Sequence, residues 1–190
     1  MAEYESLTHQ FEPVYNSSSR ILILGTFPSV KSRAYGFYYG HPQNRFWKVL
    51  AAIANAPVPA SIPEKKQLLL SRGIALWDVI QSCDIIGSSD SSIRNVVPAD
   101  IPWLLGQAPI SAIFGNGAKA CELFQKYTQP LLAESFPDGT CTKAPCAIRK
   151  LPSTSPANAA WKLERLVDYW KQEIMAAQPE TNVDKPVPAP

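Results

Sequence analysis

The sequence is poor in residues that bind metals or carry redox chemistry. Its 190 residues include four cysteines, none in a CxxC pair, and two histidines, His9 and His41. Zinc sites and iron–sulfur clusters need several such ligands at fixed spacing, so we expect neither a metal nor a cofactor. The acidic, polar N-terminus lacks the basic and apolar regions of a secretory signal, which predicts a cytoplasmic protein with reduced cysteines.

Other missing patterns exclude further classes. No apolar run approaches the roughly 20 residues that span a bilayer, so we expect no membrane contact. The GxSxG, HExxH and GxGxxG motifs are absent, which argues against small-molecule esterases, zinc peptidases and dinucleotide oxidoreductases. The 18 scattered prolines exclude a coiled coil. A net charge of +2 is only weak evidence for a polyanionic partner.

The sequence does contain enough apolar residues for a core, at 46% of the chain. Short apolar runs that alternate with helical periodicity predict an α/β fold. Strands are expected over 20–24, 74–80, 110–114 and 147–151. Helices are expected over 45–56, 63–71, 118–127 and 157–177, with a short helix after Asp100. We therefore predict a three-layer α/β/α sandwich around a central, mostly parallel four-stranded sheet.

The domain organisation expected from this pattern is simple. Residues 1–177 form one domain, and the proline-rich segment 178–190 is a disordered tail. Residues 26–44 and 82–95 are rich in glycine, serine and other turn-forming residues, and we expect both to be loops. Ligands of open α/β sheets bind at the carboxyl ends of strands, so the loops that leave these ends are the candidate site.

An unusual run of aromatic residues lies in the first of these loops. Four aromatics occupy five positions between 35 and 39, and basic side chains surround them: Lys31, Arg33, Arg45 and Lys48. Aromatic faces stack on nucleobases and cations bind phosphates, so this composition indicates nucleic-acid binding. The alternative is that some of these rings only fix the loop to the core.

Two polar residues follow the aromatic run. Asn44 has an amide that donates and accepts, suited to holding a water molecule or contacting a base edge. It also stands where a helix begins, so it could be an N-cap. His41 could carry a proton or be a structural histidine bonded to the backbone.

Two later loops also leave strand ends. Residues 115–119 (GNGAK) have the glycines of a phosphate-binding turn but not the P-loop spacing, so a tight turn from strand to helix is the default interpretation. Residues 151–158 (LPSTSPAN) hold three hydroxyls between two prolines, after Arg149 and Lys150. Such a loop could bind a DNA phosphate or enter a duplex. Alternatively, Ser155 only caps the last helix.

Three segments, GTFPS (25–29), YYGHPQNRFW (38–47) and LPSTSPAN (151–158), resemble motifs of the uracil-DNA glycosylase superfamily. The resemblance is closest to its hypoxanthine-DNA glycosylase (DNA-deoxyinosine glycosylase) branch, and residues 75–80 and 87–93 also look like this branch. The HPxNRFW segment is similar to the G:T/U mismatch-specific glycosylases as well. The resemblance implies an α/β/α sandwich that flips a base into a pocket and hydrolyses its N-glycosidic bond without metal.

The resemblance also implies roles for individual residues. Asn44 would be catalytic, placing the attacking water. The base-binding residues would be Gly25, Thr26, Phe27, Pro28, Ser29, Tyr39 and His41, with Tyr39 stacking on the base. The DNA-binding residues would be Lys150, Ser153, Thr154, Ser155, Pro156 and Asn158. The protein would act as a monomer on double-stranded DNA that contains a deaminated base, in base excision repair at the nucleoid.

One departure from the superfamily pattern bears on the substrate. Relatives that act on uracil or mismatches carry a water-activating Asp or Asn where this sequence has Phe27. The hypoxanthine branch relies instead on the asparagine that corresponds to Asn44, which favours hypoxanthine as the main substrate. No lysine is clearly placed for a Schiff base, so a monofunctional glycosylase is expected. The alternatives are a glycosylase for uracil or mismatched thymine and a non-catalytic module that binds lesion DNA or a nucleotide.

Overall fold

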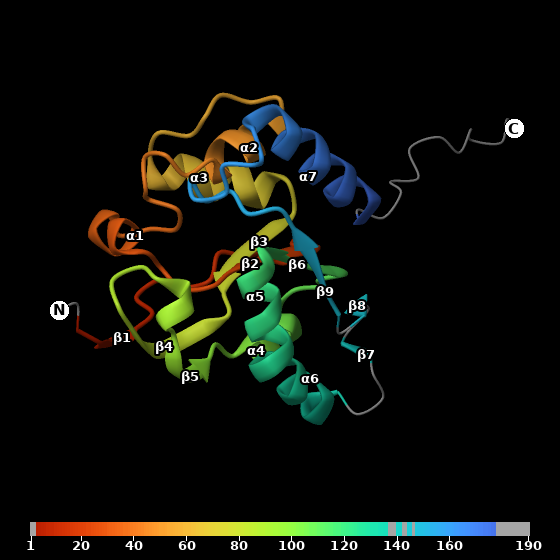
Figure 1. Ribbon diagram of the computed structural model, residues 1–190. Coiled ribbons are helices and arrows are strands. Elements are labelled where there is room, and N and C mark those ends of the chain that lie inside the picture. The colour runs from red at the N-terminus through yellow and green to blue at the C-terminus, as the bar shows by residue number, and fades with distance from the viewer. Residues whose placement is uncertain (1–2, 137–139, 142–143, 146, 178–190) are drawn as a thin grey trace, which may run out of the picture.

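The computed structural model describes residues 3–136, 140–141, 144–145 and 147–177, and the tail predicted at 178–190 lies outside these ranges. A four-stranded sheet forms its centre (Figure 1). All neighbouring strands in it are parallel. Its order is β3 (Ile74–Asp78), β2 (Ile21–Gly25), β6 (Ala112–Asn116) and β9 (Ile148–Leu151).

Helices cover both faces of this sheet (Figure 1). One layer contains α2 (Phe46–Ile53), α3 (Ile62–Ser71) and α7 (Leu163–Ala177). The other contains α4 (Ile101–Gln107), α5 (Ala118–Leu123) and α6 (Gln129–Ser135), with a π-helical turn, Phe124–Thr128, between α5 and α6. All of β2 is buried, because both of its faces are covered. The predicted three-layer α/β/α sandwich is confirmed.

Local signals placed several helix ends correctly. Ser61 and Glu64 form a capping box before α3, Pro63 lies in its first turn, and Gly73 follows its end at φ +64°. Asp100 accepts a hydrogen bond from the Trp103 amide and caps α4. These elements form where the sequence predicts them because their caps are local interactions.

Both segments expected to be loops contain regular structure. The first holds α1 (Val30–Tyr35). The second holds most of β4 (Ile80–Ile85), a 3₁₀ turn (Asp90–Ser92) and the start of β5 (Arg94–Pro98). Together with β1 (Glu5–Thr8), β4 and β5 form a second, antiparallel sheet. The strand predicted over 74–80 therefore breaks at Val79, where the chain passes from one sheet to the other.

The last helix begins at Leu163 and not at residue 157. Residues 157–162 form turns, although their alanine content favours a helix. The Ser155 hydroxyl accepts a hydrogen bond from the Ala157 amide inside this turn, so the interpretation of Ser155 as a cap of the last helix is wrong. None of the helices in the described ranges is long and apolar enough to cross a membrane.

Two glycines give opposite predictions for the same substitution. A Cβ on Gly115 would lie 2.5 Å from Cys121 Sγ, whereas a Cβ on Gly106 would meet nothing within 4 Å. Gly115→Ala should therefore lower the free energy of unfolding by about 1–3 kcal/mol through overpacking. Gly106→Ala, inside α4, should raise it by about 0.5–1 kcal/mol through helix propensity. Urea denaturation of both variants measures this, and an equal change in the two would contradict the packing described here.

Candidate functional site

A cavity of about 250 Å³ opens at the carboxyl ends of the parallel strands. It brings together three segments that are far apart in the sequence: residues 25–32, 38–44 and 153–156. Most of the predicted site residues line it: Gly25, Thr26, Phe27, Pro28, Ser29, Tyr39, His41, Asn44, Ser153, Thr154, Ser155 and Pro156. Lys150 and Asn158 do not; they line a neighbouring depression with Trp161 and Tyr169. The cavity wall also contains Asp78, Asp90 and Asn116, which the sequence analysis did not select.

Two hydrogen bonds hold the side chain of Asn44. Its Oδ1 accepts from the Phe46 amide at 3.0 Å and from Thr154 Oγ1 at 2.9 Å. The first bond reaches the first residue of α2, but the N-cap of this helix is Arg45, so the N-cap position that the sequence suggested for Asn44 is wrong by one residue. An amide oxygen has two lone pairs, so both acceptor positions are occupied. The Nδ2 group remains a donor, and no partner for it occurs among the described residues.

Asn116 fixes the direction of the bond between Thr154 and Asn44. Its Nδ2 donates to Thr154 Oγ1 at 2.9 Å, and its Oδ1 accepts from the Thr154 amide at 3.0 Å. Because Thr154 Oγ1 accepts from Asn116, its own proton is directed to Asn44 Oδ1. Thr154 is fully buried. The chain Asn116–Thr154–Asn44, called the amide relay below, thus orients the carboxamide of Asn44.

Arg45 links the start of α2 to the loop at 153–161. Its guanidinium donates to the carbonyl oxygens of Thr154 (3.3 Å), Ser155 (2.6 Å) and Asn158 (3.1 Å), and to that of Trp161. The sequence analysis placed Arg45 among the cations available to phosphates. Its donors bind this loop instead, because the carbonyls of the turns need partners.

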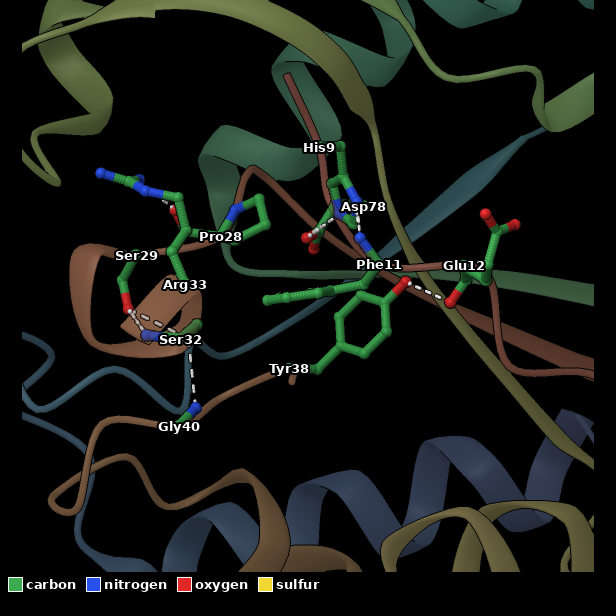
Figure 2. Close-up of polar contacts among 10 residues, drawn as sticks. All are labelled: His9, Phe11, Glu12, Pro28, Ser29, Ser32, Arg33, Tyr38, Gly40 and Asp78. Carbon is green, nitrogen blue, oxygen red and sulfur yellow. Dashed lines mark hydrogen bonds and ion pairs between the residues drawn. The ribbon is translucent and has the colours of Figure 1, made fainter. Parts of the chain in front are cut away.

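The first motif is also fixed by its own side chains (Figure 2). Ser29 caps α1 by accepting from the Ser32 amide, and its hydroxyl lies 3.0 Å from Ser32 Oγ. Ser32 Oγ in turn accepts from the Gly40 amide at 3.1 Å. These contacts join residues 25–32 to the aromatic segment, so hydrogen bonds link two walls of the cavity.

The four aromatics differ in environment. Phe37 and Tyr38 are buried in the core, so the alternative that some rings fix the loop is correct for these two. Tyr35 is exposed, and Lys65 Nζ lies 4.2 Å from the centre of its ring. Tyr39 lines the cavity, and one face of its ring stacks on Phe46 at a centroid distance of 3.9 Å. Tyr39 has φ +51°, an uncommon conformation for a bulky residue.

His41 and His9 have defined hydrogen-bonding roles. The Nδ1 of His41 accepts from the Gln43 amide at 3.1 Å, the backbone contact that the sequence analysis gave as one alternative. The Nδ1 of His9 accepts from the Phe11 amide at 3.1 Å, and its Nε2 lies 2.8 Å from Asp78 Oδ2 (Figure 2). Because Nδ1 accepts, the ring proton of each neutral histidine is on Nε2. His9 therefore donates to Asp78.

Asp78 could have been found from the sequence. It is a carboxylate at the end of an apolar strand, and such strand ends border the ligand crevice. The hydrogen bond from His9 has no local signal, because the two residues are 69 positions apart. Asn116 follows an apolar strand in the same way, but its contact with Thr154 spans 38 positions. No cluster of three or more His, Cys, Asp or Glu side chains suited to a metal ion occurs in the part of the chain described.

Comparisons with known proteins agree with this geometry. The family model described as the uracil DNA glycosylase superfamily matches residues 12–174. A hypoxanthine DNA glycosylase of Methanosarcina acetivorans is 34% identical over 157 residues, 82% of this chain and 90% of the relative. One of Methanosarcina barkeri is 32% identical over 114 residues, 59% of this chain and 72% of the relative.

A solved structure is also similar. It is the solution NMR structure of a Methanosarcina acetivorans protein provisionally described as a uracil DNA glycosylase, with 29% identity and a TM-score of 0.70. The similarity covers 90% of this chain and 98% of that one. The shared fold therefore spans most of this chain.

Removing the hydroxyl of Tyr39 should stabilise the protein. This oxygen is buried, and although the Asn116 side chain lies near it, it makes no hydrogen bond of normal length among the described residues; an unmet buried group costs about 1–3 kcal/mol. Burial, and next the nearby Asp78, raise the pKa of Tyr39 above its usual range. The unfolded chain ionises near pH 10 while the folded chain stays protonated, so this residue makes stability fall as pH rises past that value.

Urea denaturation of Tyr39→Phe at pH 7 and pH 10.5 tests both effects. The variant should be more stable than the wild type, and its advantage should grow at the higher pH. Tyr169→Phe, at an exposed site on α7, is the matched control and should change little. A destabilised Tyr39→Phe protein would show that the hydroxyl has a partner.

Proposed function

Because the chain belongs to the uracil DNA glycosylase superfamily, we propose that this DNA glycosylase releases hypoxanthine from deoxyinosine in DNA. The two similar proteins named hypoxanthine DNA glycosylase support this choice of base. The observation that carries the proposal is the oriented carboxamide of Asn44 in a cavity whose first motif has Phe27 and no carboxylate. A side chain other than that of residue 27 must then place the water.

The size of the cavity suits one extruded base. Its volume of about 250 Å³ lies just below the ~300–1,000 Å³ of ordinary small-molecule pockets. A base inside a duplex cannot reach such a site, so it must leave the stack at a cost of a few kcal/mol. That cost is lowest for a weakly paired base, and this would favour deoxyinosine over normal nucleotides.

Asn44 would act on the water as a hydrogen-bond donor. Its oxygen is already held by the Phe46 amide and Thr154, so only Nδ2 is available to the cavity. A water molecule that accepts from Nδ2 would be held beside the anomeric carbon of the sugar. This contribution is positioning and not base catalysis. The cationic charge that develops on the sugar as the bond breaks would be stabilised in part by the DNA phosphates.

The loop at 153–156 would contact the DNA strand next to the extruded base. Ser153, Ser155 and Pro156 line the cavity beside Asn44, and Arg45 binds the carbonyl oxygens of Thr154 and Ser155 in the same loop. Lys150 and Asn158 line the adjoining depression, where a neighbouring phosphate could bind. Fixed hydroxyls and amides of this kind position the DNA backbone but do not distinguish one base sequence from another.

Release of free base from duplexes with single lesions tests the activity. Hypoxanthine should be released fastest among hypoxanthine, uracil, mismatched thymine and normal bases. Asn44→Ala should lower this rate about 100-fold or more through loss of positioning. Gln172→Ala, an exposed change on α7, is the control and should keep the full rate. If uracil is released faster than hypoxanthine, the main substrate is uracil and the proposal is wrong. If the protein binds lesion DNA but releases no base, it is a non-catalytic binding module.

The amide relay gives a second prediction. Thr154→Val keeps the shape but removes the hydroxyl that donates to Asn44 and accepts from Asn116. It should lower kcat about 10-fold or more with little change in KM, and cost about 1–3 kcal/mol of stability because Asn116 loses a partner. Thr154→Ser retains the hydroxyl and should recover most of kcat. Equal kcat values for the Thr154→Val and Thr154→Ser proteins would show that the amide relay does not orient Asn44.

A further inference from the structure

The depression beside the cavity contains aromatic residues that the proposed hydrolysis does not use. Its volume is about 460 Å³, and Ser153 lines both the depression and the cavity. The function proposed above assigns it only a phosphate, through Lys150 and Asn158. Trp161 and Tyr169 also line it, and neither has a role so far.

Trp161 and Tyr169 stand perpendicular to each other. Their ring centroids are 5.5 Å apart and their planes meet at 84°, so the two rings form the sides of a corner, called the aromatic corner below. Tyr169 is 39% exposed and lies outside the hydrophobic core, to which α7 contributes Leu166, Trp170 and Ile174. Packing of the core therefore does not account for the ring of Tyr169.

Positive charge accompanies the aromatic corner. Lys150 lines the same depression, and the guanidinium carbon of Arg165 lies 4.1 Å from the centre of the Trp161 ring. Neither cation takes part in any salt bridge among the described residues. Both charges are therefore available to an anion. Aromatic rings next to unpaired cations are the combination with which proteins bind unpaired nucleotides, the rings taking the bases and the cations the phosphates.

The position of the depression indicates which nucleotide it takes. Consecutive nucleotides of one strand are joined by a single phosphate, and the two hollows meet at Ser153. An extruded base in the cavity thus places the next phosphate at this loop and the next base at the depression. We propose that the aromatic corner binds the base adjacent to the extruded one in the same strand, so that the protein takes up a dinucleotide.

This inference rests on the proposed function in one respect, because it requires lesion DNA in the cavity. It requires binding only and not hydrolysis. The neighbouring base also leaves the duplex stack, which costs free energy as the first extrusion does. Stacking on an aromatic side chain offsets that cost, and it tolerates any base because every base has a π-face. The aromatic corner would therefore add affinity without restricting the sequence around the lesion.

Dissociation constants for Tyr169→Ala and the wild type test the inference. The duplexes carry 2′-fluoro-deoxyinosine, which resists hydrolysis, and a baseless sugar is placed on its 5′ side, on its 3′ side, opposite it, or nowhere. Tyr169→Ala should weaken binding to the complete duplex about 10-fold, as loss of one base–ring stack predicts. The variant and the wild type should bind equally when the adjacent nucleotide on one side of the inosine lacks its base.

The matched control is Tyr4→Ala. Tyr4 is 42% exposed and, like Trp161, has an arginine against its ring, but it lies next to β1 of the antiparallel sheet. This variant should bind every duplex as the wild type does. If Tyr169→Ala weakens binding to all the duplexes equally, or to none, the inference is wrong. If only the baseless sugar opposite the inosine removes the effect, the aromatic corner binds a base of the other strand, and the inference is also wrong.

The binding experiment separates this inference from the proposed function, because no reaction occurs on 2′-fluoro sugars. If Tyr169→Ala shows the expected dependence on the adjacent base, but natural duplexes release no hypoxanthine, the inference stands and the glycosylase proposal fails. If hypoxanthine is released and Tyr169→Ala binds as tightly as the wild type, the glycosylase proposal stands and the inference fails.

A cross-linking experiment on the wild-type protein tests the inference without any variant. The duplex carries 5-iodouracil on one side of the 2′-fluoro-deoxyinosine, and irradiation joins iodouracil to an aromatic ring that stacks on it. Mass spectrometry of the digested complex then identifies the attached residue. The inference predicts attachment to Trp161 or Tyr169 from one of the two adjacent positions. Attachment only to other residues would overturn it.

Discussion

The hydrogen bond from Thr154 to Asn44 joins the two halves of the cavity, and the arrangement of the site depends on it. It connects the loop after β9 to Asn44, two residues before α2, over 110 positions of sequence. Asn116, at the end of β6, sets its direction, and Arg45 holds the same loop through its backbone. Since an unpaired buried polar group is costly, each member of this network stabilises the orientation of the others.

The network has a chemical consequence for Asn44. A carboxamide normally offers one acceptor and one donor, but here the acceptor is used inside the protein. The side chain therefore offers the cavity an N–H at a fixed position. In the function we propose, this N–H orients a water molecule without increasing its basicity. The cavity wall does contain two carboxylates, Asp78 and Asp90, and His9 orients the first of them.

The sequence predicted the parallel sheet and its helices because their signals are local. Apolar runs such as residues 20–24 mark buried strands, and Asp100 and Pro63 mark helix starts. It did not predict the antiparallel sheet, in which β1 pairs with the distant β4, and β4 pairs with β5, the next strand along the chain. Ser82 and Asp84 in β4 are polar because this strand is only partly buried, and polar residues indicated a loop. The helical run expected from residue 157 instead forms turns whose carbonyls Arg45 holds.

The sequence predicted which residues line the candidate site better than it predicted the hydrogen bonds between them. Glycine, proline and asparagine after apolar strands indicated which segments meet at the strand ends. The hydrogen-bond partners of those residues could not be predicted, because the partners are far away in the sequence. From the sequence alone, Thr154 is expected to be a surface hydroxyl and Arg45 to bind a phosphate. The most direct test of the central claim is a crystal structure with a duplex that carries 2′-fluoro-deoxyinosine. We expect hypoxanthine out of the helix and inside this cavity, with its anomeric carbon near Asn44 Nδ2; a base still stacked in the duplex, with this cavity empty, would contradict the account.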